Sequence, residues 1–98
     1  MRRIAAHYVY WRQLHKMSYI ELNDDNTFNG VFPLQDEIAG TAFYDGLLVP
    51  VDKPEQLIRL NGFSDLFRQL EQSGITENIS VGSRVYLYRI HNNKIYAV

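Results

Sequence analysis

The sequence predicts one small domain that is mainly β, an antiparallel sheet or sandwich with one amphipathic helix. The 98 residues fit a single domain, and the 46% that are hydrophobic suffice for a core of modest size. Short apolar and aromatic runs, separated by Asp, Asn, Gly and Pro, recur along most of the chain, as is typical of strands and turns. Near residues 64–73 the apolar residues are instead spaced as on one face of a helix.

The first three predicted strands cover residues 4–11, 17–23 and 27–32. Residues 4–11 carry apolar or aromatic side chains on both alternating faces, a pattern typical of a central strand that is covered on both sides. Between the second and third strands, Asp24-Asp25-Asn26 predicts a hairpin turn, because these short side chains bond their own backbone and tolerate left-handed φ angles.

Glycine and proline divide the next part of the chain. Gly30 predicts a bulge in the third strand, and Pro33, which has no N–H to donate, predicts the end of that strand. The polar residues 34–40 predict a loop. After the loop, Asp45-Gly46 divides the apolar stretch of residues 41–49, and this dipeptide favours a two-residue type I′ hairpin turn.

Two helical segments are predicted in the middle of the chain. Residues 54–60 suit one or two helical turns, since proline is tolerated at a helix start and Gly62 follows. The clearer helix covers residues 64–73, because Ser64 is a suitable N-cap and Gly74 is placed to end it. Its apolar face consists of Leu66, Phe67 and Leu70.

The C-terminal residues predict two closing strands. In residues 84–90 and 94–98 the side chains alternate between two faces, and His91-Asn92-Asn93 supplies the turn between the strands. No internal repeat or low-complexity segment interrupts residues 1–98, which we expect to form one domain.

Composition excludes several classes of site and partner. The sequence has no cysteine, which rules out disulfides, thiolate metal sites and cysteine nucleophiles. A net charge of −1 argues against broad binding of nucleic acid or of acidic membranes. No apolar stretch approaches the roughly 20 residues of a membrane span, and residues 4–11 are too short and too polar for a secretory signal. We therefore expect a cytoplasmic protein.

Three segments of the chain resemble a known family. The opening Arg2-Arg3-Ile4-Ala5-Ala6-His7-Tyr8-Val9-Tyr10 resembles the first strand of metal-dependent amidohydrolases of the cytosine-deaminase-like kind. In these enzymes a small β-rich domain, built from both chain ends, flanks a catalytic (β/α)₈ barrel. Residues 39–50 resemble the segment that leads into the barrel, and residues 75–98 weakly resemble the strands that return from it.

The resemblance implies an accessory domain without its enzyme. In the family a His-x-His metal pair follows the lead-in segment, whereas here Pro50 is followed by Val51-Asp52-Lys53-Pro54-Glu55. A barrel of about 250 residues is far longer than residues 51–74. The implied organisation is accessory-domain-like strands over residues 1–50, a helical bridge over 51–74 in place of the barrel, and closing strands over 75–98. We expect no enzymatic activity, no metal and no cofactor.

The residues offer no alternative catalytic site. His7, His15 and His91 lack the i, i+2 or i, i+4 spacing that places two metal ligands on one face, and we expect His15 and His91 in or near turns. The carboxylate pairs Asp24-Asp25 and Asp36-Glu37 fall in turn-like sequence, where solvated acids are usual. No Gly-x-Ser-x-Gly motif is present.

Charges are unevenly distributed along the chain. Residues 1–20 and 78–98 contain Lys and Arg but no acid, whereas residues 21–45 contain acids but no Lys or Arg. If the first and last strands are neighbours, as the resemblance implies, the chain ends form a basic region and the turns an acidic one. Such polarity would steer self-association or docking, whereas the alternative is that these are solvated strand edges whose charges discourage stray pairing.

Tyrosine and tryptophan are the strongest indication of function. The chain has more of them than so small a domain easily buries, and both are enriched in interface cores, although core packing is a competing explanation. We predict a non-catalytic β-rich interaction domain that forms a homodimer, or binds another protein, through the candidate interface residues Tyr8, Tyr10, Trp11, Tyr86 and Tyr88. The alternative is a small ligand-binding protein or enzyme that uses the aromatic face and the carboxylates.

Overall fold

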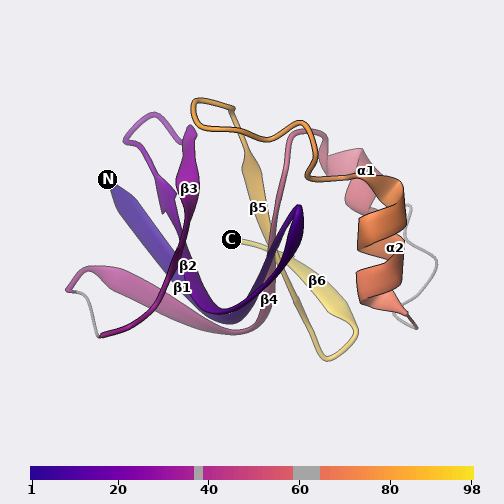
Figure 1. The fold of residues 1–98 in the computed structure, drawn as a ribbon, viewed down its shortest axis with the longest axis horizontal. Coiled ribbons are helices and arrows are strands. Elements are labelled where there is room, and N and C mark those ends of the chain that lie inside the picture. The colour runs from indigo at the N-terminus through magenta and orange to yellow at the C-terminus, as the bar shows by residue number, and fades with distance from the viewer. Residues whose placement is uncertain (37–38, 59–64) are drawn as a thin grey trace.

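The computed structural model describes residues 1–36, 39–58 and 65–98, and it is mainly β, as the sequence predicts. One six-stranded mixed sheet has the strand order β3-β2-β1-β4-β5-β6 (Figure 1). The strands are β1 (Arg2–Trp11), β2 (Gln13–Leu22), β3 (Phe28–Pro33), β4 (Thr41–Val51), β5 (Tyr86–His91) and β6 (Lys94–Ala97). The helices are α1 (Pro54–Ile58) and α2 (Leu66–Ser73).

β1 lies inside the sheet, which confirms the prediction of a central first strand. It pairs antiparallel with β2 on one side and parallel with β4 on the other. Among the described strands β1–β4 is the one parallel pair, a departure from the predicted antiparallel arrangement. Both chain ends belong to the sheet, as expected, but the prediction of adjacent first and last strands is wrong, because β4 and β5 lie between β1 and β6.

Residues 41–51 form a single strand, so the predicted hairpin is wrong. Asp45-Gly46 does not reverse the chain. Gly46, at φ +102°, instead lies in a bulge of β4, where the pairing with β1 shifts between Ala6 and Tyr8. The bulge brings Gly46 so close to β5 that a Cβ atom there would lie 2.5 Å from the carbonyl oxygen of Ile90. The glycine is therefore needed for a bulge and not for a turn.

The long strands β1, β2 and β4 bend near their middles, so that the sheet is folded into a U (Figure 1). Met17 and Gly46, which lie in this region, both have positive φ angles. We call one half of the U the first arm, which contains β3 and residues 2–6, 18–22 and 41–44. The other half, the second arm, contains β5, β6 and residues 8–11, 13–16 and 47–51.

The main core fills the inside of the U and draws on both arms. The segment of residues 79–85 bridges them: Trp11 Nε1 donates a hydrogen bond to the carbonyl oxygen of Ile79 at 2.9 Å, and the Phe28 N–H donates to that of Ser83 at 2.7 Å. Trp11 belongs to the second arm and Phe28 to the first, so the segment holds the two together. The buried members of this core are Ile4, Ala6, Val9, Ile20, Leu22, Phe28, Leu48, Ile79, Val85 and Leu87.

A second core lies on the outer face of the second arm, beneath α1 and α2 (Figure 1). The helix predicted near residues 64–73 is confirmed by α2, which Gly74 ends with φ +62°. The predicted cap Ser64 and the residues 59–62 lie outside the described residues, but α1 begins at Pro54 as expected. The buried members of this second core are Tyr10, Leu47, Val49, Val51, Leu57, Leu70, Ile75 and Ile90.

Most of the predicted turns and strand ends are confirmed. Asn26 has a positive φ angle in the first acidic turn, as do Asn92 and Asn93 in the last hairpin. Gly30 lies where the pairing of β2 with β3 shifts, and Pro33 ends β3.

The second strand begins earlier than predicted, at Gln13 instead of residue 17. A tight turn at Arg12, with φ 63°, reverses the chain directly after β1. The backbone N–H of Arg12 donates to the Thr76 hydroxyl oxygen at 2.7 Å, which anchors this turn to a distant segment. Residues 13–16 have no apolar pattern of their own, and they are extended because they pair with the second half of β1.

Candidate functional site

The outer face of the first arm carries a row of side chains that neither α1 nor α2 covers (Figure 1). Strand register places Phe32, Tyr19, Ala5 and Phe43 side by side, in that order across β3, β2, β1 and β4. Directly paired residues point to the same side of a sheet, and strands lie about 4.8 Å apart, so the row is about 14 Å long. We call these four residues the aromatic row.

The aromatic row meets solvent at both ends. Phe32 is 39% exposed and Phe43 is 47% exposed, whereas Ala5 between them is fully buried. The Phe32 ring tilts against Tyr19 with their centroids 5.5 Å apart, and Phe43 makes an edge contact with His7 at 5.1 Å. These neighbours hold the rings in place while the outer ring surfaces remain in water, which is unfavourable for apolar area.

A hollow lies beside the small side chain of Ala5. Its volume is about 420 Å³, and Met17, Leu34, Thr41 and Phe43 contribute to its lining. Met17 is 45% exposed, and its carbonyl oxygen accepts a hydrogen bond from the Leu34 N–H at 2.8 Å. The hydroxyl oxygen of Thr41 is buried without a hydrogen-bond partner. Gln35 and Asp36 complete the lining, so the hollow has both apolar and polar walls and has room for an aromatic side chain.

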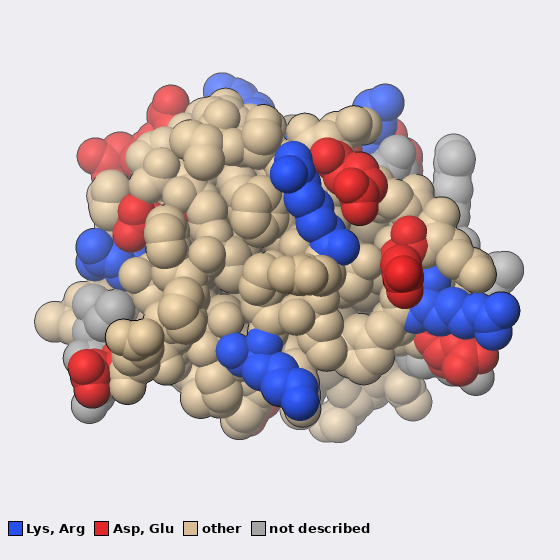
Figure 2. Space-filling view, viewed as in Figure 1, with Lys and Arg blue, Asp and Glu red and all other residues tan. Residues whose placement is uncertain are grey.

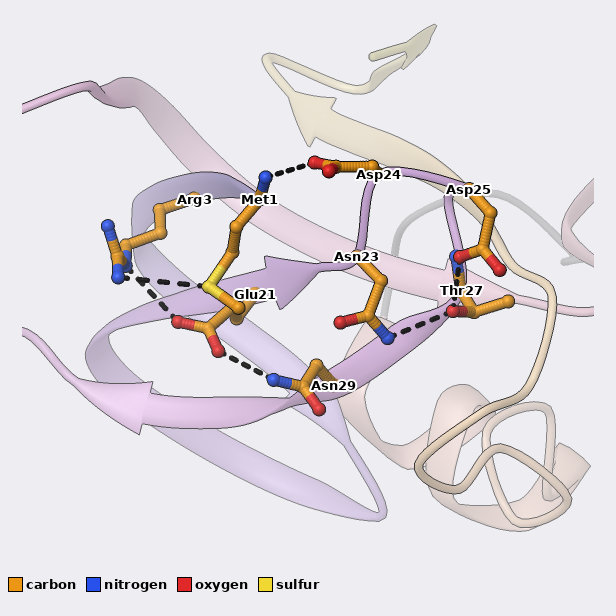
Figure 3. Close-up of polar contacts among 8 residues, drawn as sticks. All are labelled: Met1, Arg3, Glu21, Asn23, Asp24, Asp25, Thr27 and Asn29. Atoms are coloured by element: carbon orange, nitrogen blue, oxygen red, sulfur yellow. Dashed lines mark hydrogen bonds and ion pairs between the residues drawn. The ribbon is translucent and has the colours of Figure 1, made fainter.

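A polar row runs alongside the aromatic row. Arg3 pairs in register with both Glu21 and Thr41, and its Nε donates to one Glu21 carboxylate oxygen at 3.1 Å (Figure 3). Asn29 Nδ2 donates to the other Glu21 oxygen at 2.6 Å. Beyond the aromatic row on the opposite side, Nδ1 of His7 lies 3.5 Å from a carboxylate oxygen of Asp45. Arg3 and Glu21 are thus paired within the chain on one side of the row, and the His7 ring lies beside the Asp45 carboxylate on the other.

The basic and acidic segments of the sequence lie next to each other in the fold. The amino group of Met1 pairs with Asp24 and the guanidinium of Arg3 pairs with Glu21, so the basic start of β1 lies against the acidic end of β2 (Figure 3). On the face drawn in Figure 2, Lys, Arg, Asp and Glu side chains lie mostly near the outline of the molecule. Acidic and basic segments of the sequence therefore compensate each other at this end of the first arm.

The five predicted interface residues do not form one surface, although Tyr10 and Tyr88 share the second core. Tyr8 and Tyr86 are 39% and 49% exposed. Tyr10 is buried beneath the helices, and Tyr88 packs partly buried against the same second core. Trp11 packs against the core inside the U. Of the five, Tyr8 and Tyr86 are thus the two that present large ring surfaces to solvent.

The aromatic row is not apparent from the sequence. Phe32 and Phe43 are ordinary apolar strand residues there, with nothing to mark them as exposed. The signal that identifies the row is register, which brings Phe43 beside Ala5 through the pairing of β4 with β1. The predicted hairpin at Asp45-Gly46 excludes this pairing, because in it the strand that contains Phe43 pairs with residues 47–49 and not with β1.

No metal site is present in the described part of the chain. Within residues 1–36, 39–58 and 65–98, no three His, Asp or Glu side chains are grouped closely enough to hold a metal ion. His15 and His91 lie close to the tight turns at Arg12 and at Asn92-Asn93, as predicted, and Glu37 lies outside the described residues. Neither α1 nor α2, the helices of this described part, is long and apolar enough to cross a membrane.

Comparisons with models of protein families, with curated proteins and with solved structures find no match for this chain.

Proposed function

We propose that this chain is a non-catalytic, β-rich protein-interaction domain that associates with a second copy of itself through the aromatic row. The observation that carries the proposal is a contrast on one face of the sheet. Helices cover the outer side of the second arm, whereas the outer side of the first arm leaves Phe32 and Phe43 in water. Clustered apolar surface of this kind on a small protein usually marks an interaction site.

The shape and charge of this surface suit a second copy of the chain. Phe43 borders the hollow beside Ala5, so in a two-fold arrangement each copy offers both a ring and a space for the ring of its partner. The charged pairs Arg3–Glu21 and His7–Asp45 flank the row. Because the Arg3–Glu21 pair is compensated within one chain, it presents no net charge to a second copy.

The size of the chain also permits such an interface. Its accessible surface is 5981 Å². A specific dimer typically buries about 800 Å² on each partner, a modest share of that surface. Two sheets that face each other pack about 10 Å apart with their side chains interdigitating, so two first arms would form a sandwich-like contact with the aromatic rows inside.

Light scattering after size-exclusion chromatography tests the proposal with a matched pair of variants. Phe43 in the aromatic row and Phe67 on α2 are equally exposed, at 47% each. We expect wild type and Phe67→Ser to be dimers at micromolar concentration and Phe43→Ser to be a monomer. A monomeric wild type, or a dimer lost in Phe67→Ser and kept in Phe43→Ser, contradicts the proposal.

Salt distinguishes an aromatic interface from a charged one. Exposed ion pairs contribute at most about 1 kcal/mol each, and salt screens them. Burial of aromatic surface is not weakened by screening. We therefore expect the dimer to persist at high salt, and dissociation on adding salt would assign the contact to charges.

We also propose that the chain is related to the accessory domain of the amidohydrolases and does not catalyse hydrolysis. The proposal rests on the segments of residues 2–10 and 39–50, which resemble that domain most and contribute β1 and β4 to one sheet. The adjacent first and last strands that the resemblance implies are not found. The His-x-His pair of the family is absent after Pro50. We expect elemental analysis of untagged protein to find well below one equivalent of zinc. We expect its turnover of amidine and deaminase substrates to stay at the background rate. One tightly held equivalent of metal, with turnover abolished by chelation, contradicts this proposal.

A further inference from the structure

A separate hollow lies on the outer side of the second arm, where the start of α2 approaches the turn between β5 and β6 (Figure 1). Its volume is about 430 Å³, and its lining includes Tyr8, Asp65 and Phe67. We propose that this hollow binds a neutral sugar through one pyranose ring. The aromatic row contributes no residue to the described lining, so this inference stands apart from the proposed self-association.

The deepest part of this hollow is apolar and belongs to the second core. Leu47 and Ile90 line it, and both are buried members of that core. Gly46 lines it as well, and its backbone lies so close to β5 that a Cβ atom would meet the Ile90 carbonyl oxygen. A ligand therefore meets a surface that the fold has already formed, and little ordering of the chain opposes its binding.

Two aromatic rings from different elements line the hollow and remain in water. Tyr8 of β1 is 39% exposed, and Phe67 of α2 is 47% exposed. Within the described part of the chain, neither ring packs against another ring or against a guanidinium group. Both therefore offer free ring surface, on which a flat ligand face made of C–H groups packs well because the face of an aromatic ring is electronegative.

Three polar side chains of the lining are free to bond a ligand. Asp65 occupies the N-cap position of α2 with φ 55°, and its carboxylate makes no capping hydrogen bond. Asn92 and Asn93 form the tight turn between β5 and β6. Among residues 1–36, 39–58 and 65–98, none of these three side chains has a hydrogen bond or an ion pair. The carboxylate accepts hydrogen bonds, and each carboxamide both donates and accepts.

Rings and polar groups together indicate the class of ligand. A pyranose ring has C–H groups on its faces for Tyr8 and Phe67, and the hydroxyl groups around its edge can donate to Asp65 and bond the carboxamides. At pH 7, with His91 neutral, Asp65 is the one charged group among the described lining residues, and it repels an anion. A nucleobase has polar groups along only part of its edge, so it meets fewer of the polar side chains, which come from two different elements. The hollow is at the small end of ligand sites and suits a single ring.

Titration of the ¹⁵N-labelled protein with the methyl glycosides of glucose, galactose and mannose, followed by NMR, tests the inference. For at least one of them we expect saturable shifts of amides in residues 65–67 and 90–93, with a dissociation constant of about 5 mM. Sorbitol has hydroxyl groups but no ring face, so it should bind about fivefold more weakly than that glycoside. Thymine, a nucleobase, should also bind more weakly.

Three variants locate the contact. Phe67→Ala removes one ring, and Asp65→Asn removes the charge while asparagine tolerates the left-handed backbone, so each should weaken glycoside binding by about fivefold in a protein whose spectrum remains folded. Phe43→Ala in the aromatic row is the matched control, because Phe43 and Phe67 are equally exposed, and it should leave glycoside binding unchanged. Shifts that saturate with none of the three glycosides, equal or tighter binding of sorbitol or thymine, or unchanged affinity in both Phe67→Ala and Asp65→Asn would each overturn the proposal.

Discussion

The two arms of the sheet share three strands but differ in what lies on their outer faces. On the second arm the outward residues Tyr10, Leu47 and Val49 are buried beneath two helices. On the first arm these strands continue beside β3, and the outward residues Phe43 of β4 and Phe32 of β3 remain exposed. The comparison teaches that alternating apolar residues in a strand identify a face that favours burial. The pattern does not tell whether the same chain or another one buries that face.

The largest expected effect concerns the covered arm. Leu70 on α2 is fully buried against the second arm, so Leu70→Ala removes buried apolar volume and leaves a cavity. We expect the free energy of unfolding to fall by about 2–5 kcal/mol. Urea denaturation measures this loss. Phe67→Ala on the same helix serves as the control, because its ring is 47% exposed, and an equal loss in both variants would show that α2 does not cover a core.

The junction between the arms should be the next most sensitive position. Gly46 has φ +102°, and a Cβ atom would meet the Ile90 carbonyl oxygen at 2.5 Å. Gly46→Ala should therefore lower the free energy of unfolding by about 1–3 kcal/mol. Gly40→Ala is the matched control, since Gly40 has φ +80° but no atom within 4 Å of a built Cβ. Thermal or urea unfolding should rank Gly40→Ala as the milder change, and the reverse order would argue against the close approach of β4 to β5.

The burial of Tyr10 should make the covered arm sensitive to alkaline pH. Burial raises the pKa of the Tyr10 hydroxyl above its usual 10.0, and the charges of Glu71 and Glu77 raise it further. A raised pKa in the folded state means that the contribution of Tyr10 to stability is complete below pH 10 and is lost as the pH rises through the folded-state value. Urea midpoints measured from about pH 8 to about pH 11 should fall less steeply for Tyr10→Phe than for wild type. Parallel curves would contradict the burial of this hydroxyl.

The smallest expected effect is on the uncovered arm. Phe43 is 47% exposed, so Phe43→Ala at high dilution should change the free energy of unfolding of the monomer by less than about 0.5 kcal/mol. At higher protein concentration, wild type should gain stability because the dimer forms only from folded chains, and Phe43→Ala should not. Midpoints measured over a range of protein concentrations separate the two contributions. A concentration dependence that persists in Phe43→Ala would move the interface away from the aromatic row.

The turns and the end of α2 could be predicted from the sequence, because they depend on the conformational preferences of single residues. Asn26, Asn92 and Asn93 adopt the positive φ angles that short polar side chains tolerate, and Gly74 ends α2 as a glycine with positive φ usually does. The two-sided apolar pattern of residues 4–11 likewise predicted a strand inside the sheet, and β1 lies there between β2 and β4.

Features decided by contacts across the fold could not be predicted in this way. Asp45-Gly46 suits a hairpin and a bulge equally, and the choice depends on Ile90 of β5, which lies beside it only in the folded chain. Tyr8 and Tyr10 look alike in the sequence, yet Tyr10 is buried because α1 and α2 cover it, and Tyr8 is exposed. The aromatic row depends on the parallel pairing of β1 with β4, which no local pattern encodes.

That parallel pair also bears on the order in which the chain folds. β1 can pair with β2 as soon as the tight turn at Arg12 forms, whereas its other partner, β4, begins only at Thr41, so that Arg3 and Thr41 must find each other across a long loop. Closing such a loop costs chain entropy before the contact is made, and folds rich in distant strand pairs form slowly for this reason. Until β4 has been synthesised, the β1–β2 hairpin therefore has one unpaired edge, that of β1. Pairing with β4 closes this edge, to which another chain could otherwise pair.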